Sequence, residues 1–197
     1  MKSFRPVSAL EEAQACLTAL LAQEGFNENL EASIDLIVRA FEKNLPVLSC
    51  GNGGSACDAM HFAEEFTGRF RKNRPPLPAM AISDPAHLTC VANDYGFENV
   101  FSRSVTAFGS SGAVLLAIST SGNSQNILKA IEAAHLKKMS VIGLTGACEG
   151  EMDTLCDKIF LIPSKSSERI QECHIKIIHT LIEGTERRLF PENYRES

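Results

Sequence analysis

Apolar residues recur at three- and four-residue steps over the first 44 residues, which is the spacing of one face of an α-helix. The pattern runs over about 10–21 and more strongly over about 30–41. We expect Asn27 to cap the second helix, with Glu28 and Glu31 in its first turn, where carboxylates favour the helix dipole. The chain therefore predicts two helices at its N-terminal end.

From about residue 46 the pattern changes to short β-rich runs separated by helical stretches. The runs lie at 47–50, 79–82, 113–119, 140–145 and 158–162, and the helical patterns at about 55–69, 97–108, 124–137 and 167–190. Short buried strands that alternate with helices predict a parallel sheet covered on both faces. We expect an α/β fold, a three-layer sandwich with a five-stranded parallel, flavodoxin-like sheet plus N-terminal helices. Ligands of such folds bind where the strands end.

This pattern divides the chain into two parts. Residues 1–44 form a helical extension, packed on the same core or on a neighbouring subunit and suited to oligomer packing. Residues 45–197 form the α/β domain.

Composition and charge exclude several classes of protein. The net charge is −5, and the longest basic cluster is the short stretch 69–74, which argues against a nucleic-acid partner. The longest apolar runs are far below the ~18 residues of a membrane span, and the N-terminus has no signal-peptide pattern. The seven cysteines are scattered without a Cys-x-x-Cys pair, as reduced thiols would be. We expect a cytoplasmic protein with no membrane partner.

A glycine-rich loop follows the first strand, with Gly51, Asn52, Gly53, Gly54 and Ser55 in sequence. Glycines let a backbone turn sharply and approach a ligand closely. A plain strand-to-helix turn explains the loop equally well. The loop matches neither a dinucleotide fingerprint nor a P-loop, so no nucleotide is implied.

A hydroxyl-rich loop follows the 113–119 strand. Its hydroxyls belong to Ser119, Thr120, Ser121 and Ser124, and a helix begins near Ser124. Hydroxyls and backbone N–H groups at a helix N-terminus form an anion site. Without a nearby lysine or arginine, neutral donors and the helix dipole would hold a phosphate monoester. Serines also act simply as helix caps, but their density here favours a phosphate site.

Two helices carry ionisable groups at regular spacing. His61 and Glu65 are four residues apart and share a helix face, which suits a metal or a base with its partner, although such pairs are more often surface contacts. On the last helix, Gln171 and His179 lie about 80° apart around the axis. His174 fits equally well on spacing alone, and either histidine would also suit a helix–helix contact.

Asn93 and Asp94 follow the short run 88–92 and read as a turn. Asp94 would be available there to accept hydrogen bonds from sugar hydroxyls. A purely structural turn is the more common explanation of such a pair.

Together these segments resemble the phosphoheptose isomerases of the sugar isomerase (SIS) superfamily over nearly the whole chain. The matching stretches are 49–55, 58–65, 66–69, 93–97, 117–124 and 169–176. The resemblance implies that residues 45–197 form a SIS domain. It also implies a homotetramer in which each site lies at a subunit interface and a neighbour contributes the last helix.

The resemblance also assigns roles residue by residue. It implies one zinc ion per subunit, held by His61, Glu65, Gln171 and His179, and so selects His179 over His174. The substrate contacts that the resemblance implies are Asn52, Gly53, Gly54, Glu65, Asn93, Asp94, Ser119, Thr120, Ser121, Ser124 and Gln171. The chain departs from many relatives at Ala56, where they carry a larger polar residue, and at Glu168, where they often carry Asp.

The residue types suit a ketose–aldose isomerisation through an enediolate. Glu65 would act as the carbon base and His179 as a proton shuttle or an aid to ring opening, while zinc would polarise the carbonyl. Because both residues would then be ligands and catalysts, the metal must be weakly held or must rearrange. By resemblance, sedoheptulose 7-phosphate becomes D-glycero-D-manno-heptose 7-phosphate, the first step towards the ADP-heptose of lipopolysaccharide.

Two other functions compete with the enzyme. A non-catalytic SIS-fold binding module of the DnaA initiator-associating type keeps the loops but lacks the full acid/base set, whereas Glu65 and His179 are both present here. A sugar-phosphate sensor would need a DNA-binding or partner domain, and the first 44 residues show no recognisable one.

Overall fold

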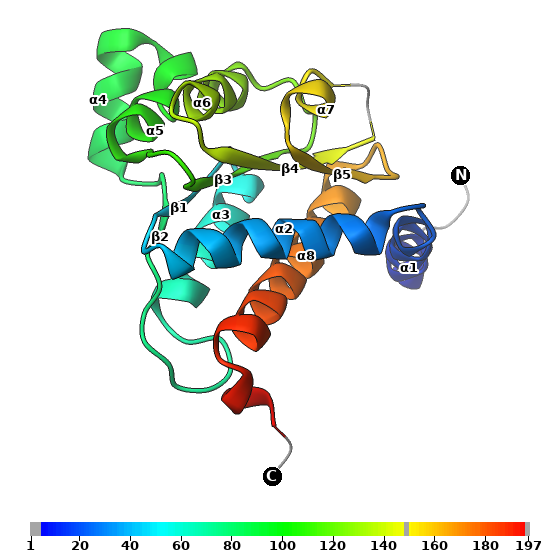
Figure 1. Ribbon diagram of the computed structural model, residues 1–197. Coiled ribbons are helices and arrows are strands. Elements are labelled where there is room, and N and C mark those ends of the chain that lie inside the picture. Colours follow the sequence, from blue (N-terminus) through cyan, green and yellow to red (C-terminus); the bar gives the residue numbers. More distant parts are fainter. Residues whose placement is uncertain (1–4, 148–149, 196–197) are drawn as a thin grey trace.

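A computed structural model describes residues 5–147 and 150–195. Five parallel strands form one sheet in the order β2-β1-β3-β4-β5, which confirms the expected flavodoxin-like sheet (Figure 1). The strands are β1 (Val47–Gly51), β2 (Ala79–Ala81), β3 (Val114–Ser119), β4 (Ser140–Gly146) and β5 (Lys158–Ile162). The strand order reverses between β1 and β3, and in open α/β sheets this switch point is where ligands bind.

Helices cover both faces of the sheet, so the expected three layers are present (Figure 1). One face carries α1 (Val7–Leu21), α2 (Phe26–Glu42), α3 (Gly54–Thr67) and α8 (Ser167–Leu189). The other face carries α4 (Pro85–Tyr95), α5 (Ser102–Phe108), α6 (Gln125–Leu136) and α7 (Met152–Leu155). Two short 3₁₀ turns, η1 (Phe97–Asn99) and η2 (Pro191–Tyr194), complete the described part.

The central strands are apolar on both sides because each face of the sheet is covered. Leu115 and Ala117 of β3 point into the core with α5 and α6. Leu116 and Ile118 point into the core with α3 and α8. The periodicity of two along a strand explains why one apolar run serves two cores.

The two N-terminal helices belong to the same hydrophobic core as α3 and α8. Leu20 and Ile37 are buried there together with Ile178 and Leu181. This is one of the two placements expected for the extension. The boundary between residues 44 and 45, and any packing on a neighbour, stay predictions.

Two local expectations were wrong, and one helix was missed. The second N-terminal helix begins at Phe26 behind Gly25, whose left-handed φ of 73° suits glycine, so Asn27 is not its cap. The 97–108 stretch is a 3₁₀ turn followed by α5 rather than one helix. Helix α4 was not expected: Asp84 caps it by accepting a hydrogen bond from the His87 N–H at 2.7 Å, and a proline follows the cap.

Within residues 5–147 and 150–195, no helix has both the length and the apolar character needed to cross a bilayer. Six cysteines lie in this part of the chain, and all six are free thiols.

Candidate functional site

The loops that leave β1 and β3 at the switch point are tied together by two asparagines. The Asn52 amide donates to the Asn126 oxygen at 2.9 Å, and the Asn126 amide donates back at 2.8 Å. Asn126 is buried in the first turn of α6, whereas Asn52 is half-buried. This reciprocal pair fixes the glycine loop relative to the helix that follows the serine loop.

The serine loop folds its hydroxyls toward one another at the end of β3. The Ser119 hydroxyl lies 3.1 Å from that of Ser124 and 3.4 Å from that of Ser121. Ser124 occupies the N-cap position of α6 but makes no side-chain cap, so its hydroxyl is not committed to the helix. The loop therefore gathers three hydroxyls at a helix N-terminus, an arrangement suited to an anion.

Thr120 and Gly122 fix the course of this loop. The Thr120 carbonyl accepts a hydrogen bond from the Gly146 N–H at the end of β4, at 3.1 Å. Gly122 has a left-handed φ of 68°. A side chain there would be strained and would crowd the Thr145 hydroxyl, 2.9 Å away.

A cavity of about 580 Å³ opens beside these loops, and its wall includes Asn52, Ser124, Glu98 and Lys129. The Lys129 ammonium lies 3.4 Å from the Glu98 carboxylate. The backbone at its own position and the nearby Lys129 lower the pKa of Glu98. The expectation that no cation lies near the serine loop was therefore wrong, because Lys129 follows Ser124 by about one and a half turns of α6.

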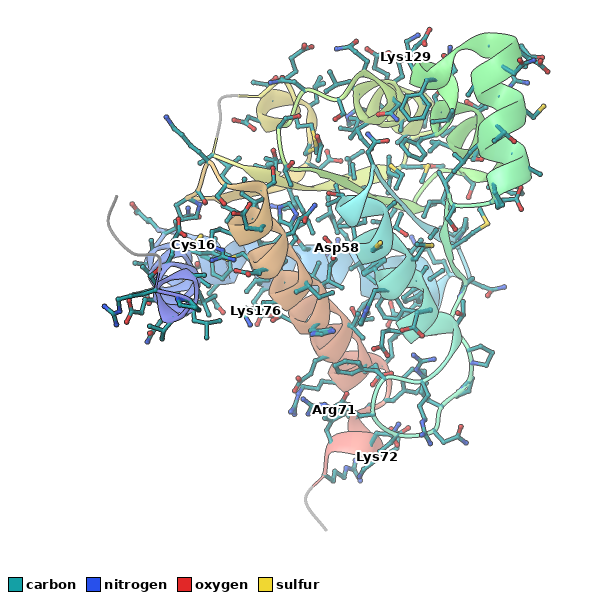
Figure 2. The ribbon with its side chains drawn as sticks, turned by 180° about the vertical axis from the view of Figure 1, so that it is seen from behind. Cys16, Asp58, Arg71, Lys72, Lys129 and Lys176 are labelled. Carbon is teal, nitrogen blue, oxygen red and sulfur yellow. The ribbon has the colours of Figure 1, made fainter. Side chains whose placement is uncertain are left out.

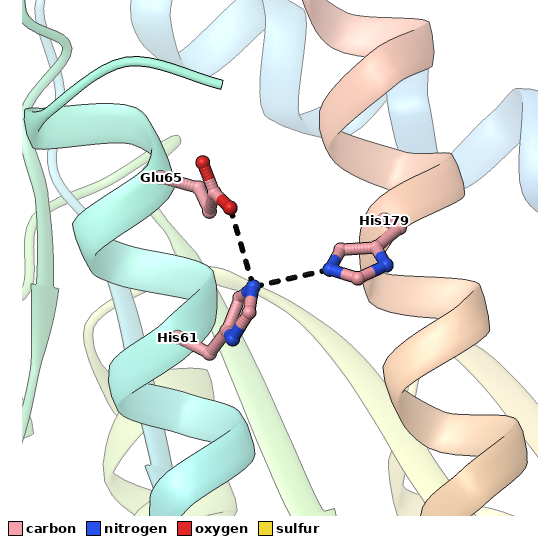
Figure 3. Close-up of side chains that lie close together, drawn as sticks. All are labelled: His61, Glu65 and His179. Carbon is pink, nitrogen blue, oxygen red and sulfur yellow. Dashed lines mark hydrogen bonds and ion pairs between the residues drawn. The ribbon is translucent and has the colours of Figure 1, made fainter. Parts of the chain in front are cut away.

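Three ligand-type side chains meet between α3 and α8 (Figure 3). The His61 Nε2 lies 3.2 Å from the Glu65 carboxylate and 3.0 Å from the His179 Nε2. One ligand atom from each residue lies within 4.8 Å of the others. Burial of His179, followed by the charge of His61, lowers the pKa of His179.

These contacts fit a shared cation. One ring nitrogen carries at most one hydrogen, so His61 Nε2 cannot donate a straight hydrogen bond to Glu65 and to His179 at once. A cation held by all three atoms would satisfy each of them. Two imidazoles and one carboxylate are also a common ligand set for catalytic zinc, in which a further position stays open.

Helices α3 and α8 run in parallel, which brings these residues together within one chain. His61 meets His179, and seven residues earlier on α3, Gly54 meets Gln171. A Cβ on Gly54 would lie 2.5 Å from the Gln171 amide nitrogen. The expectation that a neighbouring subunit contributes the last helix was wrong for His179, since buried Ile178 and Leu181 pack α8 into the same chain's core.

Gln171 lies away from the centre of the His61 group. It precedes His179 by eight residues, or about 12 Å along the helix axis. Its amide lies at Gly54, in the first turn of α3. Its expected role as a fourth ligand stays a prediction.

His174 is a core residue in this structure. It is 0% exposed, and neither ring nitrogen has a hydrogen-bond partner among the described residues. Burial lowers the pKa of His174 to about 4, and the nearby Thr145 backbone opposes part of that shift without forming a well-aligned hydrogen bond. Between the two histidines that spacing could not separate, only His179 reaches Glu65 and His61.

Asn93 and Asp94 lie apart from the cavity wall. Both are exposed in the last turn of α4, where the Asn93 amide donates to Asp94 at 2.7 Å. The expected turn comes later, at Gly96 with its φ of 90°. The interpretation of this pair as a turn was therefore wrong, and its role as a substrate contact stays a prediction.

The remaining sequence features have simple placements. Gly53 is exposed with a φ of 55° before α3, and nothing lies within 4 Å of the position a Cβ would take. Ala56 is half-buried in the first turn of α3. Glu168 is exposed in the first turn of α8, where a hydrogen bond from Ser166 lowers its pKa.

Sequence reasoning missed several residues of the site. Asn126 and Lys129 lie within five positions of Ser124, and this closeness in the sequence could have identified them as candidate site residues. Asp58 shares a helix face with His61, and one of its buried carboxylate oxygens has no hydrogen-bond partner within the described chain. Its burial raises the pKa of Asp58 to about 6.

Comparison with known proteins adds the family context. Residues 10–146 match the SIS domain family, a range that ends before α8. The chain is 56% identical to a phosphoheptose isomerase of Aeromonas salmonicida over 91% of its length and 94% of that protein. It is 50% identical to one of Fusobacterium nucleatum, over 96% and 98%. The structure of a phosphoheptose isomerase from Francisella tularensis superposes with a TM-score of 0.86 at 36% identity, covering 91% of this chain and 95% of that one.

Proposed function

This chain belongs to the phosphoheptose isomerases, a family of SIS-domain enzymes, and from that premise we propose that it converts D-sedoheptulose 7-phosphate into D-glycero-D-manno-heptose 7-phosphate. The observation that carries this proposal is the meeting of Glu65, His61 and His179. It supports an enzyme over a binding module, because a binding module has no need of a carboxylate and an imidazole held together.

Glu65 has the chemistry of the carbon base. Its carboxylate would take a proton from C1 of the ketose, which leaves an enediolate, and would return that proton to C2. The side chain is 16% exposed, so solvent has little access to it during the transfer.

His179 would move the second proton. The C2 oxygen gains a proton and the C1 oxygen loses one, so that an aldehyde stands at C1 and a hydroxyl at C2. The lowered pKa of His179 favours a neutral imidazole, which can accept one proton and release another.

His61, Glu65 and His179 would hold the expected zinc ion, with Gln171 as the expected fourth ligand. When bound, zinc supplies positive charge that stabilises the enediolate oxygens. The proposed stoichiometry is one ion per subunit.

The phosphate would bind at the other end of the site. The hydroxyl donors would be Ser119, Thr120, Ser121 and Ser124, and Lys129 would add the positive charge that the loop itself lacks.

The sugar would lie along the first part of α3. The loop formed by Asn52, Gly53 and Gly54 leads into this helix, and about 10 Å of the helix separates Gly54 from His61. That span suits a seven-carbon sugar phosphate, with Asn93 and Asp94 as further proposed contacts.

We extend the proposal to the cellular setting. The enzyme would be a cytoplasmic homotetramer with no nucleic-acid or membrane partner, and its product would feed the ADP-heptose of lipopolysaccharide. The alternative is a non-catalytic module of the DnaA initiator-associating type, which the presence of Glu65 and His179 in one group disfavours.

A turnover assay with sedoheptulose 7-phosphate and added zinc tests the proposal. We expect wild type to form the aldose, and Glu65→Gln to lose turnover while it keeps the oligomeric state and the thermal midpoint of the zinc-free protein. A wild-type protein without turnover that binds a replication protein tightly would establish the alternative.

A further inference from the structure

Arg74 lies in the segment between α3 and β2 and is almost completely buried. Its Nε donates to the Glu186 carboxylate of α8 at 2.7 Å, and each of these two side chains is 1% exposed. Removing two charges from water is unfavourable, so a buried ion pair is weak evidence of stabilisation by itself. The effect of this pair therefore depends on the groups that it holds in place.

The other donors of Arg74 point at the end of α3. Nη2 donates to the Glu65 carbonyl at 2.5 Å, and Nη1 donates to the Phe66 carbonyl at 2.6 Å. The last carbonyls of a helix have no partner within the helix, and a cation there also favours the helix dipole. The guanidinium thus caps the C-terminal turn of α3, which carries Glu65.

The opposite end of the network is anchored in α8. Glu186 follows His179 by seven residues, or about two turns. Its second carboxylate oxygen accepts a hydrogen bond from the Tyr194 hydroxyl at 2.9 Å. Burial, and then the hydrogen bond to Glu186, raise the pKa of Tyr194 to about 12, so the hydroxyl remains a donor at neutral pH.

We infer that Arg74 is a positioning residue for the Glu65–His61–His179 group, because one rigid guanidinium joins the Glu65 turn of α3 to the helix that carries His179. The inference rests on the proposed function of that group. Catalytic geometry is sensitive at this scale, since a displacement of about 1 Å can lower a rate by roughly 100-fold.

Arg188, on the same helix as Glu186, provides the matched control. Its guanidinium pairs with Glu31 and Asp35 of α2, and its hydrogen bonds within the described residues go to α2 rather than to α3. Loss of these pairs should leave the proposed site unchanged. Arg71 is unsuitable, because its guanidinium lies over the rings of Tyr194 and Phe70, and the Phe70 ring lies against that of His179.

Arg74→Lys is the test variant. It keeps a positive charge beside Glu186, but an ammonium on a flexible stem cannot reproduce the planar fork of a guanidinium. We expect zinc affinity to fall about 10-fold and the visible absorption spectrum of the cobalt-substituted protein to shift. We expect kcat to fall about 10- to 100-fold and KM to change less than about 3-fold. Arg188→Gln should match wild type in all four measurements.

A folded Arg74→Lys with wild-type zinc affinity, cobalt spectrum and kcat overturns the inference, as does a wild type that binds neither metal. If Arg74→Lys does not fold, the isosteric Glu186→Gln decides by the same criteria.

The proposed isomerase function and the positioning role of Arg74 can fail separately. A wild type that binds zinc but does not isomerise the sugar phosphate refutes the proposed function, while zinc affinity and the cobalt spectrum still test Arg74.

Discussion

Asn52 and Asn126, 74 positions apart in the chain, exchange two amide hydrogen bonds across the switch point of the sheet. Each side chain satisfies the donor and the acceptor of the other at nearly equal distances, 2.9 and 2.8 Å. The pair therefore sets the distance between the glycine loop and the first turn of α6.

We predict that Asn126→Ala lowers stability by about 1–3 kcal/mol, because it leaves the Asn52 amide unpaired beside a buried position. Urea unfolding of both single variants and the double variant measures the coupling between the two residues. Residues in contact typically couple by about 0.5–3 kcal/mol. Strictly additive single and double variants would show that the two amides act independently.

Metal binding gives the second prediction. His61→Ala and His179→Ala should each reduce bound zinc well below the level of about one ion per chain expected for wild type. Removal of zinc with a chelator should lower the thermal midpoint of wild type and leave that of either variant nearly unchanged. His135→Ala is the control, because His135 is exposed on α6 in the opposite layer. Equal zinc content in all four proteins would contradict the proposed ligands.

Lys129 should affect binding of the phosphate rather than the chemical step. Figure 2 shows it on the other side of the sheet from Asp58, which lies on α3 near the proposed proton-transfer group. A partly exposed charged hydrogen bond contributes roughly 1–1.5 kcal/mol, so Lys129→Gln should raise KM about 5- to 10-fold with kcat nearly constant.

Inorganic phosphate gives an independent measurement of the same contact, since it should inhibit Lys129→Gln less than wild type. Lys137→Gln, at the opposite end of α6, should behave like wild type. A change in kcat alone would place Lys129 elsewhere in the mechanism.

Two glycines of the loop after β1 should respond differently to the same substitution. A Cβ on Gly51 would clash with the Ser55 backbone oxygen, which cannot move aside, so Gly51→Ala should be destabilised by roughly 2–4 kcal/mol. A Cβ on Gly54 meets only the end of the flexible Gln171 side chain. Gly54→Ala should therefore stay within about 1 kcal/mol of wild type in stability.

Gly54→Ala also tests Gln171 as a ligand. If the amide helps to hold zinc, displacing it should weaken zinc binding about 10-fold. Isothermal titration on Gly54→Ala and Gln171→Ala would then give the same loss. Unchanged affinity in both would remove Gln171 from the ligand set.

The fold was predictable from sequence because its signals are local. Each strand is a short apolar run, and the pattern at 158–162 matched β5 to the residue. Helix α4 was missed because its start depends on Asp84 and Pro85, while its apolar periodicity is weak and only Val91 is buried. Local patterns therefore located the strands better than this short helix.

The site was predictable only in part. The spacing of His61 and Glu65 indicated a shared face, but no sequence pattern chose between His174 and His179. Their difference arises from the packing of α8, which buries the first ring and brings the second to α3. Lys129 was missed although it follows Ser124 by only five positions, because the sequence does not show that the two side chains line one cavity.

His174 provides the last prediction, on the pH dependence of stability. Its folded pKa of about 4 is below the ordinary value of 6.5, so the unfolded chain binds more protons between these two pH values. Its contribution to stability is therefore complete above about pH 6.5 and is lost as the pH falls toward 4. For one proton and a shift of this size, the loss is on the order of 3 kcal/mol.

His174→Met should remove this component while it largely preserves the volume of the core. Urea unfolding at pH 7 and at pH 4.5 should show that wild type loses more stability than the variant, because the sulfur of methionine does not titrate. The exposed His135 provides the control, and His135→Gln should follow wild type at both pH values. Equal losses in wild type and His174→Met would mean that the buried ring is already protonated or is hydrated in the folded protein.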